Sequence, residues 1–171
     1  MKTYPVLLFA AVLFTGGCQS SQTAGSTPEP TNVTVVFHEP DNFTDVRDSY
    51  GNGTSQYYLD VISQYLKETA TKLVPKGETL TVTFSDIDLA GDIPPGRIDS
   101  VRIIKAIYIP RMTLTFQLKD ASGAIVKEGS RQLSDLDFQM KFTPSIDRND
   151  PLYYDKQMLG DWIRKEFPPV S

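Results

Sequence analysis

The side chains most able to do chemistry are carboxylates that follow a strand-like stretch, Thr79 to Gly91. In its first half apolar residues alternate with threonine and serine, the period-two pattern of a strand with one buried face. The alternation then breaks, and Asp86 and Asp88 follow where we expect the strand to end. Gly91 allows a turn there, and Asp135 ends a later hairpin that we expect nearby. Asp86, Asp88, Gly91 and Asp135 are therefore our candidate functional residues.

Two carboxylates can serve as acid and base in glycoside hydrolysis, where their separation across a cleft decides whether the sugar's configuration is retained or inverted. The stretch also resembles the start of a calcium loop, but Ala90 stands where a third ligand is needed and Arg97 where the closing glutamate is needed. The sequence therefore predicts no calcium site. More often such carboxylates accept backbone amide hydrogen bonds or pair with arginines, here Arg97, Arg102 or Arg111.

Other catalytic chemistries lack their residues. His38 is the only histidine, and nothing around it reads as a nucleophile elbow, so a Ser-His-Asp hydrolase is not indicated. Zinc sites need several Cys and His ligands, which this composition does not supply. The glycines are scattered among turns rather than gathered in a phosphate-binding loop. We expect no metal and no cofactor, and we favour a protein that is not an enzyme.

The elements that must position the carboxylates begin with strands. Strand-like patterns occupy Val33 to Phe37, Thr79 to Ser85, Val101 to Ile109, Met112 to Leu118 and Ala124 to Leu133. A turn at Asp120 to Gly123 joins the last two in a hairpin. Phe43, in the loop after the first strand, is expected to reach the core.

Two amphipathic helices complete the pattern. The first starts after a cap at Thr54 or Ser55 and runs to Leu73, with an apolar stripe of Tyr58, Val61, Ile62, Tyr65, Leu66, Thr69 and Leu73. The second starts at Asp150 and Pro151 and ends before Pro168; its apolar side carries Leu152, Met158, Leu159, Trp162, Ile163 and Phe167, with Asp155, Lys156, Asp161 and Lys165 opposite. Trp162 either anchors this helix on the sheet or forms a surface binding hot spot.

This order of elements predicts an α+β fold: a single mainly antiparallel sheet of about four or five strands with two helices on one face. Residues 32–171 are expected to form one domain. The strand order does not follow from the patterns.

The N-terminus has the features of an export signal. Lys2 precedes an apolar run, Tyr4 to Phe14, and residues 1–17 fit a signal peptide. The segment Thr15 to Cys18 resembles the lipobox of bacterial lipoproteins, which are cleaved before the cysteine and lipidated on it, although a lipobox usually has leucine at the position of Thr15. Lipidation of Cys18 is our interpretation; the alternative is an ordinary signal that is removed together with Cys18. Residues 18–31 are polar and rich in Ser, Thr and Pro, as in a flexible tether.

The charge balance bears on partners. The formal net charge is -4, which argues against nucleic acid as a partner. By the lipoprotein resemblance, the protein meets the membrane through its lipid anchor. Gln19 and Ser20 lack the aspartate that retains lipoproteins in the inner membrane, which indicates a periplasmic domain anchored to the outer membrane.

Several blocks resemble a known family. Phe37 to Val46, Ser85 to Gly96, Arg111 to Leu118, Arg131 to Asp135 and Asp150 to Ile163 are similar, in the same order, to the bacterial family called domain of unknown function 3016. The resemblance implies an exported bacterial protein and no particular activity.

Two classes of function remain. The first is a non-enzymatic envelope protein that binds another protein or an envelope polymer. The alternative is a hydrolase or metal-dependent enzyme that uses Asp86, Asp88 and Asp135.

Overall fold

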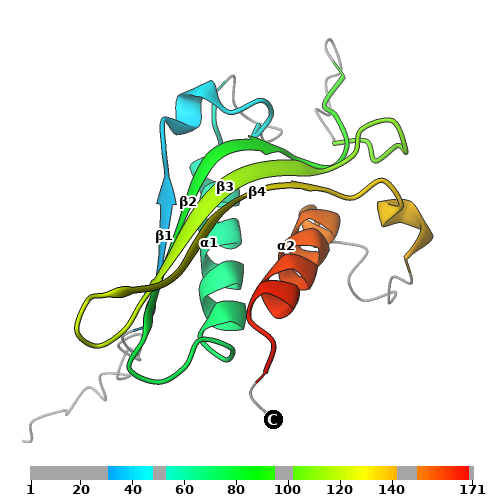
Figure 1. Cartoon of the computed structure of the whole chain (residues 1–171). Helices are drawn as coiled ribbons and strands as arrows, with labels where there is room; N and C mark the ends of the chain where they lie inside the picture. The colour runs from blue at the N-terminus through cyan, green and yellow to red at the C-terminus, as the bar shows by residue number, and fades with distance from the viewer. Residues whose placement is uncertain (1–30, 48–52, 95–101, 142–149, 170–171) are drawn as a thin grey trace, which may run out of the picture.

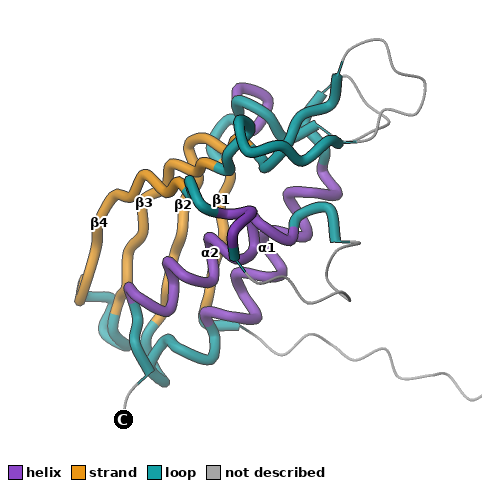
Figure 2. Tube along the Cα trace, turned by 90° about the vertical axis from the view of Figure 1, so that its right-hand side faces the viewer, coloured by secondary structure: helices purple, strands orange, loops and turns teal. Residues whose placement is uncertain are grey.

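The computed structural model of the chain describes residues 31–47, 53–94, 102–141 and 150–169. Its centre is a four-stranded sheet in the order β1-β2-β3-β4, and α1 and α2 lie on the same face of that sheet (Figures 1 and 2). The predicted α+β class and the predicted placement of both helices on one face are therefore confirmed.

The first strand, β1 (Val33–Phe37), pairs in parallel with β2 (Thr79–Asp88). Parallel neighbours need a crossover connection, and α1 (Gln56–Ala70) supplies it. Between β1 and α1 a 3-10 turn, η1 (Pro40–Asn42), is followed by Phe43, whose side chain is buried as predicted.

The predicted end of β2 at Ser85 was wrong, since the strand continues to Asp88. A register shift between Phe84 and Asp86 leaves Ser85 as an extra residue opposite β3. Such a bulge moves the following residues to the other phase of the alternation, so Ile87 faces the core. Asp86 and Asp88 are consequently strand residues and not part of a loop.

The predicted hairpin is confirmed as β3 (Arg111–Lys119) and β4 (Ile125–Ser134), which are antiparallel. The Asp120 carboxylate closes the turn by accepting hydrogen bonds from the backbone N–H groups of Ser122 and Ala124 at 2.8 and 3.0 Å. After β4 comes a second 3-10 turn, η2 (Phe138–Met140). β4 is an edge strand, because among the described strands its neighbour in the sheet is β3 alone.

The strand predicted at Val101 to Ile109 was also wrong. Residue 101 lies outside the described residues, and in the remainder only Ile103 makes a bridge, antiparallel to Asp92. Ile107 is 73% exposed in a turn. The apolar run signalled burial, but Arg102 is held by an ion pair with Asp45 and lies outside any strand.

The helices lie where the patterns placed them, with shifted ends. Ser55 caps α1 by accepting a hydrogen bond from the Tyr58 N–H at 3.4 Å, and the helix ends at Ala70 with a turn to Leu73. α2 (Tyr153–Glu166) begins later than predicted, because the Asp150 carboxylate accepts from the Leu152 N–H within a turn that precedes the helix.

The core lies between the sheet and the two helices. Its fully enclosed side chains include Leu80, Val82, Phe84 and Leu114 from the strands and Ile62, Leu66, Leu159 and Ile163 from the helices. Trp162 packs on Phe116 of β3, with ring centroids 6.0 Å apart, and so anchors α2 on the sheet as predicted. Within the described part of the chain, no helix is both long enough and apolar enough to cross a membrane.

Candidate functional site

Asp86 fastens the loop before α1 to the sheet. Its Oδ1 accepts a hydrogen bond from the Thr44 N–H at 2.8 Å, and its Oδ2 accepts from the Thr44 hydroxyl at 3.0 Å. Both carboxylate oxygens are thus used by one residue of the neighbouring segment. This is the structural role that the sequence also allowed for these residues, in which a carboxylate accepts a hydrogen bond from a backbone amide.

Asp88 lies two residues further along β2 and pairs with β3. Its Oδ2 accepts from the Arg111 guanidinium at 3.2 Å. Burial raises the pKa of this carboxyl above its ordinary value; the charges of Asp45 and Asp86 act in the same direction, and Arg111 opposes them. The ion pair with Arg111 joins β2 to β3.

Gly91 belongs to a polar centre built around Arg102. Gly91 has φ +84, and a Cβ there would lie 2.7 Å from the Ile103 carbonyl oxygen, so only glycine fits. Its own carbonyl accepts from Arg102 Nη1 at 3.0 Å. Arg102, with its side chain 4% exposed, also pairs with Asp45 at 3.0 Å and donates to the Arg47 carbonyl at 2.8 Å.

The ion pair sets the ionisation of Asp45. Burial alone raises the pKa of this carboxyl, but hydrogen bonds and charge from Arg102, together with hydrogen bonds from Arg47, outweigh burial and leave the pKa lowered. Arg102 thereby joins three segments, those of Asp45, Gly91 and its own loop. The ion pair between Asp45 and Arg102 thus holds these segments together, and both of its side chains are buried.

Asp155 is a buried acid that sequence reasoning placed on the exposed side of the second helix. It is 0% exposed, and its Oδ1 accepts from the Ala90 N–H at 3.1 Å. Oδ2 has no hydrogen-bond partner among the described residues. Burial raises the pKa of Asp155 to about 7, against the opposing Ala90 hydrogen bond and Arg102 charge, while the charge of Asp88 adds to the rise. Asp155 stands three residues after Leu152 and four before Leu159, so helical spacing could have signalled this burial.

Asp135 lies apart from the other candidates. It follows β4, is 8% exposed, and accepts from Lys141 Nζ at 2.6 Å; Lys141 in turn contacts Asp161 of α2. Asp135 and Asp88 are separated by two strand spacings, about 10 Å. The predicted candidates thus do not converge on one point, and each has a structural partner. Among the residues that the structure places, no group of three or more His, Cys, Asp or Glu is arranged to hold a metal ion.

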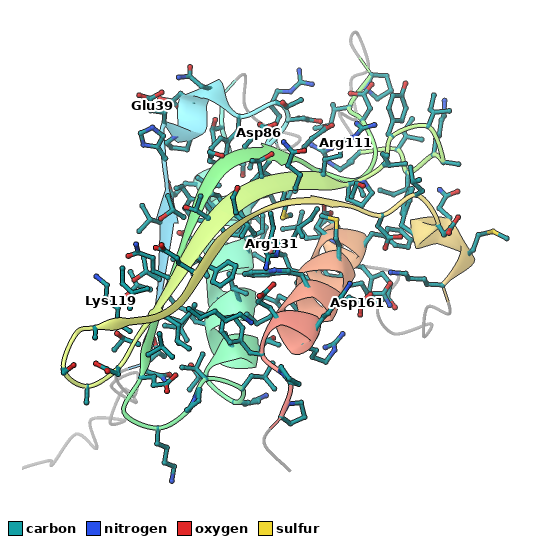
Figure 3. The ribbon with its side chains drawn as sticks, viewed as in Figure 1. Glu39, Asp86, Arg111, Lys119, Arg131 and Asp161 are labelled. Carbon is teal, nitrogen blue, oxygen red and sulfur yellow. The ribbon has the colours of Figure 1, made fainter. Side chains whose placement is uncertain are left out.

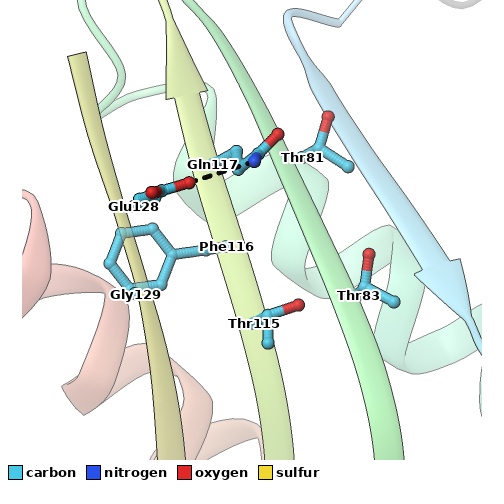
Figure 4. A pocket seen from close by; sticks show the side chains of 7 residues that line it. All are labelled: Thr81, Thr83, Thr115, Phe116, Gln117, Glu128 and Gly129. Atoms are coloured by element: carbon cyan, nitrogen blue, oxygen red, sulfur yellow. Dashed lines mark hydrogen bonds between the residues drawn. The ribbon is translucent and has the colours of Figure 1, made fainter. Parts of the chain in front are cut away.

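A first hollow, of about 450 Å³, lies over β2, β3 and β4 (Figure 4). Its side chains include Thr81, Thr83, Thr115, Gln117 and Glu128. Gln117 donates to Glu128 at 3.1 Å, so part of the polar lining is already paired. The alternating polar residues of these strands are what an uncovered sheet face needs to meet water, which accounts for this surface without a ligand.

A second hollow, of about 640 Å³, lies between β4 and α2. Four consecutive β4 residues, Arg131 to Ser134, form one wall, and Met158, Asp161, Trp162, Lys165 and Glu166 of α2 form the other. Figure 3 shows Arg131 and Asp161 on the side where β4 and α2 face each other, away from Asp86 and Arg111. Because it combines apolar, aromatic and charged side chains beside a sheet edge, this hollow is the better candidate binding site.

Trp162, which was weighed above as an anchor or a binding residue, anchors α2 and also lines the hollow. It is 7% exposed and packs on Phe116, yet it also lines the hollow. Its Nε1–H is enclosed and has no acceptor among the described residues. Buried indole N–H groups normally have one. The other lining residues, on β4 and along one side of α2, carried no signal that they would meet.

The fold and these contacts define an α+β domain with one helix-covered sheet face and a hollow beside β4, which is an edge strand among the described strands. The chain belongs to the family described as Protein of unknown function (DUF3016), whose profile matches residues 31–165. This confirms the family resemblance found from the sequence blocks. No curated protein and no solved structure matches the chain.

Proposed function

We propose that the chain is a non-enzymatic lipoprotein of the bacterial cell envelope, held at the outer membrane by lipid on Cys18, whose domain binds another envelope protein. The observation that carries the proposal is the hollow between β4 and α2, which borders a strand edge that no other described strand covers. Free edges and grooves beside a helix are surfaces on which proteins commonly take up partners.

The carboxylates that would have served an enzyme support the same conclusion. Asp86 is committed to Thr44, Asp88 to Arg111 and Asp135 to Lys141. A carboxylate pair for glycoside hydrolysis must instead face a common cleft. The lipobox-like segment before Cys18 and the polar residues 18–31 supply the anchor and the tether of this proposal.

In-cell photocrosslinking tests the proposal. A photoreactive phenylalanine analogue replaces Lys165, which is exposed and lines the hollow, in protein expressed at native level with its own signal. The matched control places the same analogue at Glu68, an exposed position of α1. We expect one envelope protein to be captured reproducibly from position 165 and not from position 68. Equal products from both positions, or capture of an envelope polymer alone from position 165, would contradict the proposal.

A further inference from the structure

We infer that the hollow between β4 and α2 binds an extended acidic peptide segment, which adds to β4 as a fifth strand. This inference rests on the proposed function and specifies the chemistry of the partner. It follows from three features of the hollow: the hydrogen-bonding groups of β4, the apolar surface beneath them, and the balance of charge around them.

The first feature is the outward backbone of β4. The Ser130 carbonyl accepts from the guanidinium of the next residue, Arg131, at 2.8 Å, so this carbonyl faces away from β3. In an antiparallel ladder, alternate residues direct both their N–H and C=O groups to the same side. Gln132 and Ser134 therefore also direct theirs to the open edge, and no backbone partner for them exists among the described residues. Two such residues can hold a short added strand.

The open stretch is also the uncharged one. Charged side chains on an edge strand discourage pairing with other chains, and β4 carries Lys127, Glu128 and Arg131 in its earlier part. From Gln132 to Ser134 it carries none. Charged side chains therefore discourage another strand from pairing with the earlier part of β4. Beside the hollow, the edge of β4 remains available for such pairing.

The second feature is an apolar floor beside this edge. Leu133 of β4 and Met158 and Trp162 of α2 line the hollow together. Side chains of an added strand would alternate between the two sheet faces, and every second one would meet this floor. An apolar side chain there covers Leu133 and Met158 and meets Trp162.

The third feature is an excess of positive charge. Glu166 is shared by Lys127 and Arg131, with ion pairs of 2.8 and 2.9 Å, so one of these two cations is left without a compensating carboxylate. Asp161 is compensated by Lys141 and Arg164. Lys165 lines the hollow with no ion pair to any residue that the structure describes. In a chain of formal net charge -4, this local excess favours an acidic segment.

The closing experiment uses the purified full-length protein in detergent and synthetic heptapeptides. The probe is acetyl-Thr-Val-Thr-Leu-Thr-Glu-Thr-amide, which places Val, Leu and Glu on one face of a strand. Its matched controls replace Glu by Lys, or methylate the backbone nitrogens of alternate residues in either register. Trp162 is the only tryptophan of the chain, so its fluorescence reports occupancy directly.

We expect the Glu peptide to change Trp162 emission saturably, the Lys peptide to bind about tenfold more weakly, and one of the two N-methylated peptides to lose binding. Lys165→Ala should weaken the Glu peptide several-fold, whereas Lys72→Ala, at an exposed position after α1, should not. With a fluorescein-labelled peptide, Trp162→Phe should weaken binding about two- to tenfold, because the phenyl ring is smaller than the indole and supplies less apolar surface to the floor of the hollow.

Three results would overturn the inference. The first is that both N-methylated peptides bind as tightly as the unmethylated Glu peptide. The second is that the Glu and Lys peptides bind equally tightly. The third is that the protein forms a dimer in solution in which a second copy occupies the β4 edge. The N-methylated peptides leave the protein unchanged, so this arm is independent of any folding defect in a variant. If crosslinking from position 165 captures an envelope protein while no peptide binds, the proposed function stands and strand addition is wrong.

Discussion

At the scale of single residues, Asp155 makes the stability of the domain depend on pH. Its carboxyl has no solvent contact, and burial raises its pKa from 3.8 to about 7. Between pH 3.8 and about 7, Asp155 of the folded protein keeps a proton that the same residue of the unfolded chain has released. The stability that this group contributes is therefore complete below pH 3.8 and is lost as the pH rises to about 7.

We expect Asp155→Asn to flatten this part of the pH profile. The amide is neutral at every pH, and its oxygen can still accept from the Ala90 N–H. The slope of unfolding free energy between pH 4 and 7 should become less negative by up to about 1.4 kcal/mol per pH unit. Urea denaturation at several pH values measures it, with Asp60→Asn, at an exposed position of α1, as the control. An unchanged slope would show that Asp155 does not titrate in this range.

Asp86 provides a second prediction at this scale. Asp86→Ala removes the acceptor of both Thr44 hydrogen bonds and leaves that N–H without its partner. We expect a loss of about 1–2 kcal/mol and a Tm lower by a few degrees. Thr44→Val, which loses only the hydroxyl contact, should cost less. A wild-type Tm for Asp86→Ala, with loss of function in the cell, would instead favour the carboxylate enzyme.

At the scale of elements, the segment 102–109 is held to the residues after β2 by backbone hydrogen bonds and by the side chain of Arg102. Arg102 bonds to Asp45, to the Gly91 carbonyl and to the Arg47 carbonyl. Arg102→Ala leaves the buried Asp45 carboxylate with Arg47 as its remaining cation, at 3.1 Å, so the loss should be smaller than the about 3–5 kcal/mol typical of a buried charge left without any partner. Hydrogen exchange should then rise at the Gly91 and Asp92 amides, which donate to this segment.

The matched comparison is the double variant Arg102→Ala with Asp45→Asn. Because it also removes the carboxylate charge that has lost its buried arginine, it should recover part of the lost stability. If the double variant is as unstable as the sum of the two single variants, the ion pair is not what holds the segment.

The same segment shows where sequence patterns fail. The apolar run at residues 103–109 predicted a strand, but periodicity does not record that Arg102 finds its partner 57 residues away. The bulge at Ser85 likewise hid the last part of β2, because a bulge changes the phase of the alternation. Both helices and the β3–β4 hairpin were predictable because their patterns are local.

At the scale of the whole molecule, the fold class followed from the order of elements, whereas the strand order did not. The parallel pairing of β1 with β2 depends on where α1 crosses the sheet, and no local pattern encodes it. The hollow between β4 and α2 arises from the same packing. Of its lining, only Trp162 was singled out in advance, since a lone tryptophan on an amphipathic helix is conspicuous.

Anchoring of the whole molecule is the last prediction. If Cys18 carries lipid, Cys18→Ser should move the protein from the membrane fraction to the soluble periplasmic fraction, because acyl chains supply the membrane affinity. The domain should keep its wild-type Tm, since residue 18 precedes the residues matched by the family profile, 31–165. Fractionation and metabolic labelling with a palmitate analogue measure the change. As a control, Ser20→Ala should still be labelled and remain with the membrane. Wild-type protein that is unlabelled and already soluble would mean that the signal is cut elsewhere and that the domain acts untethered.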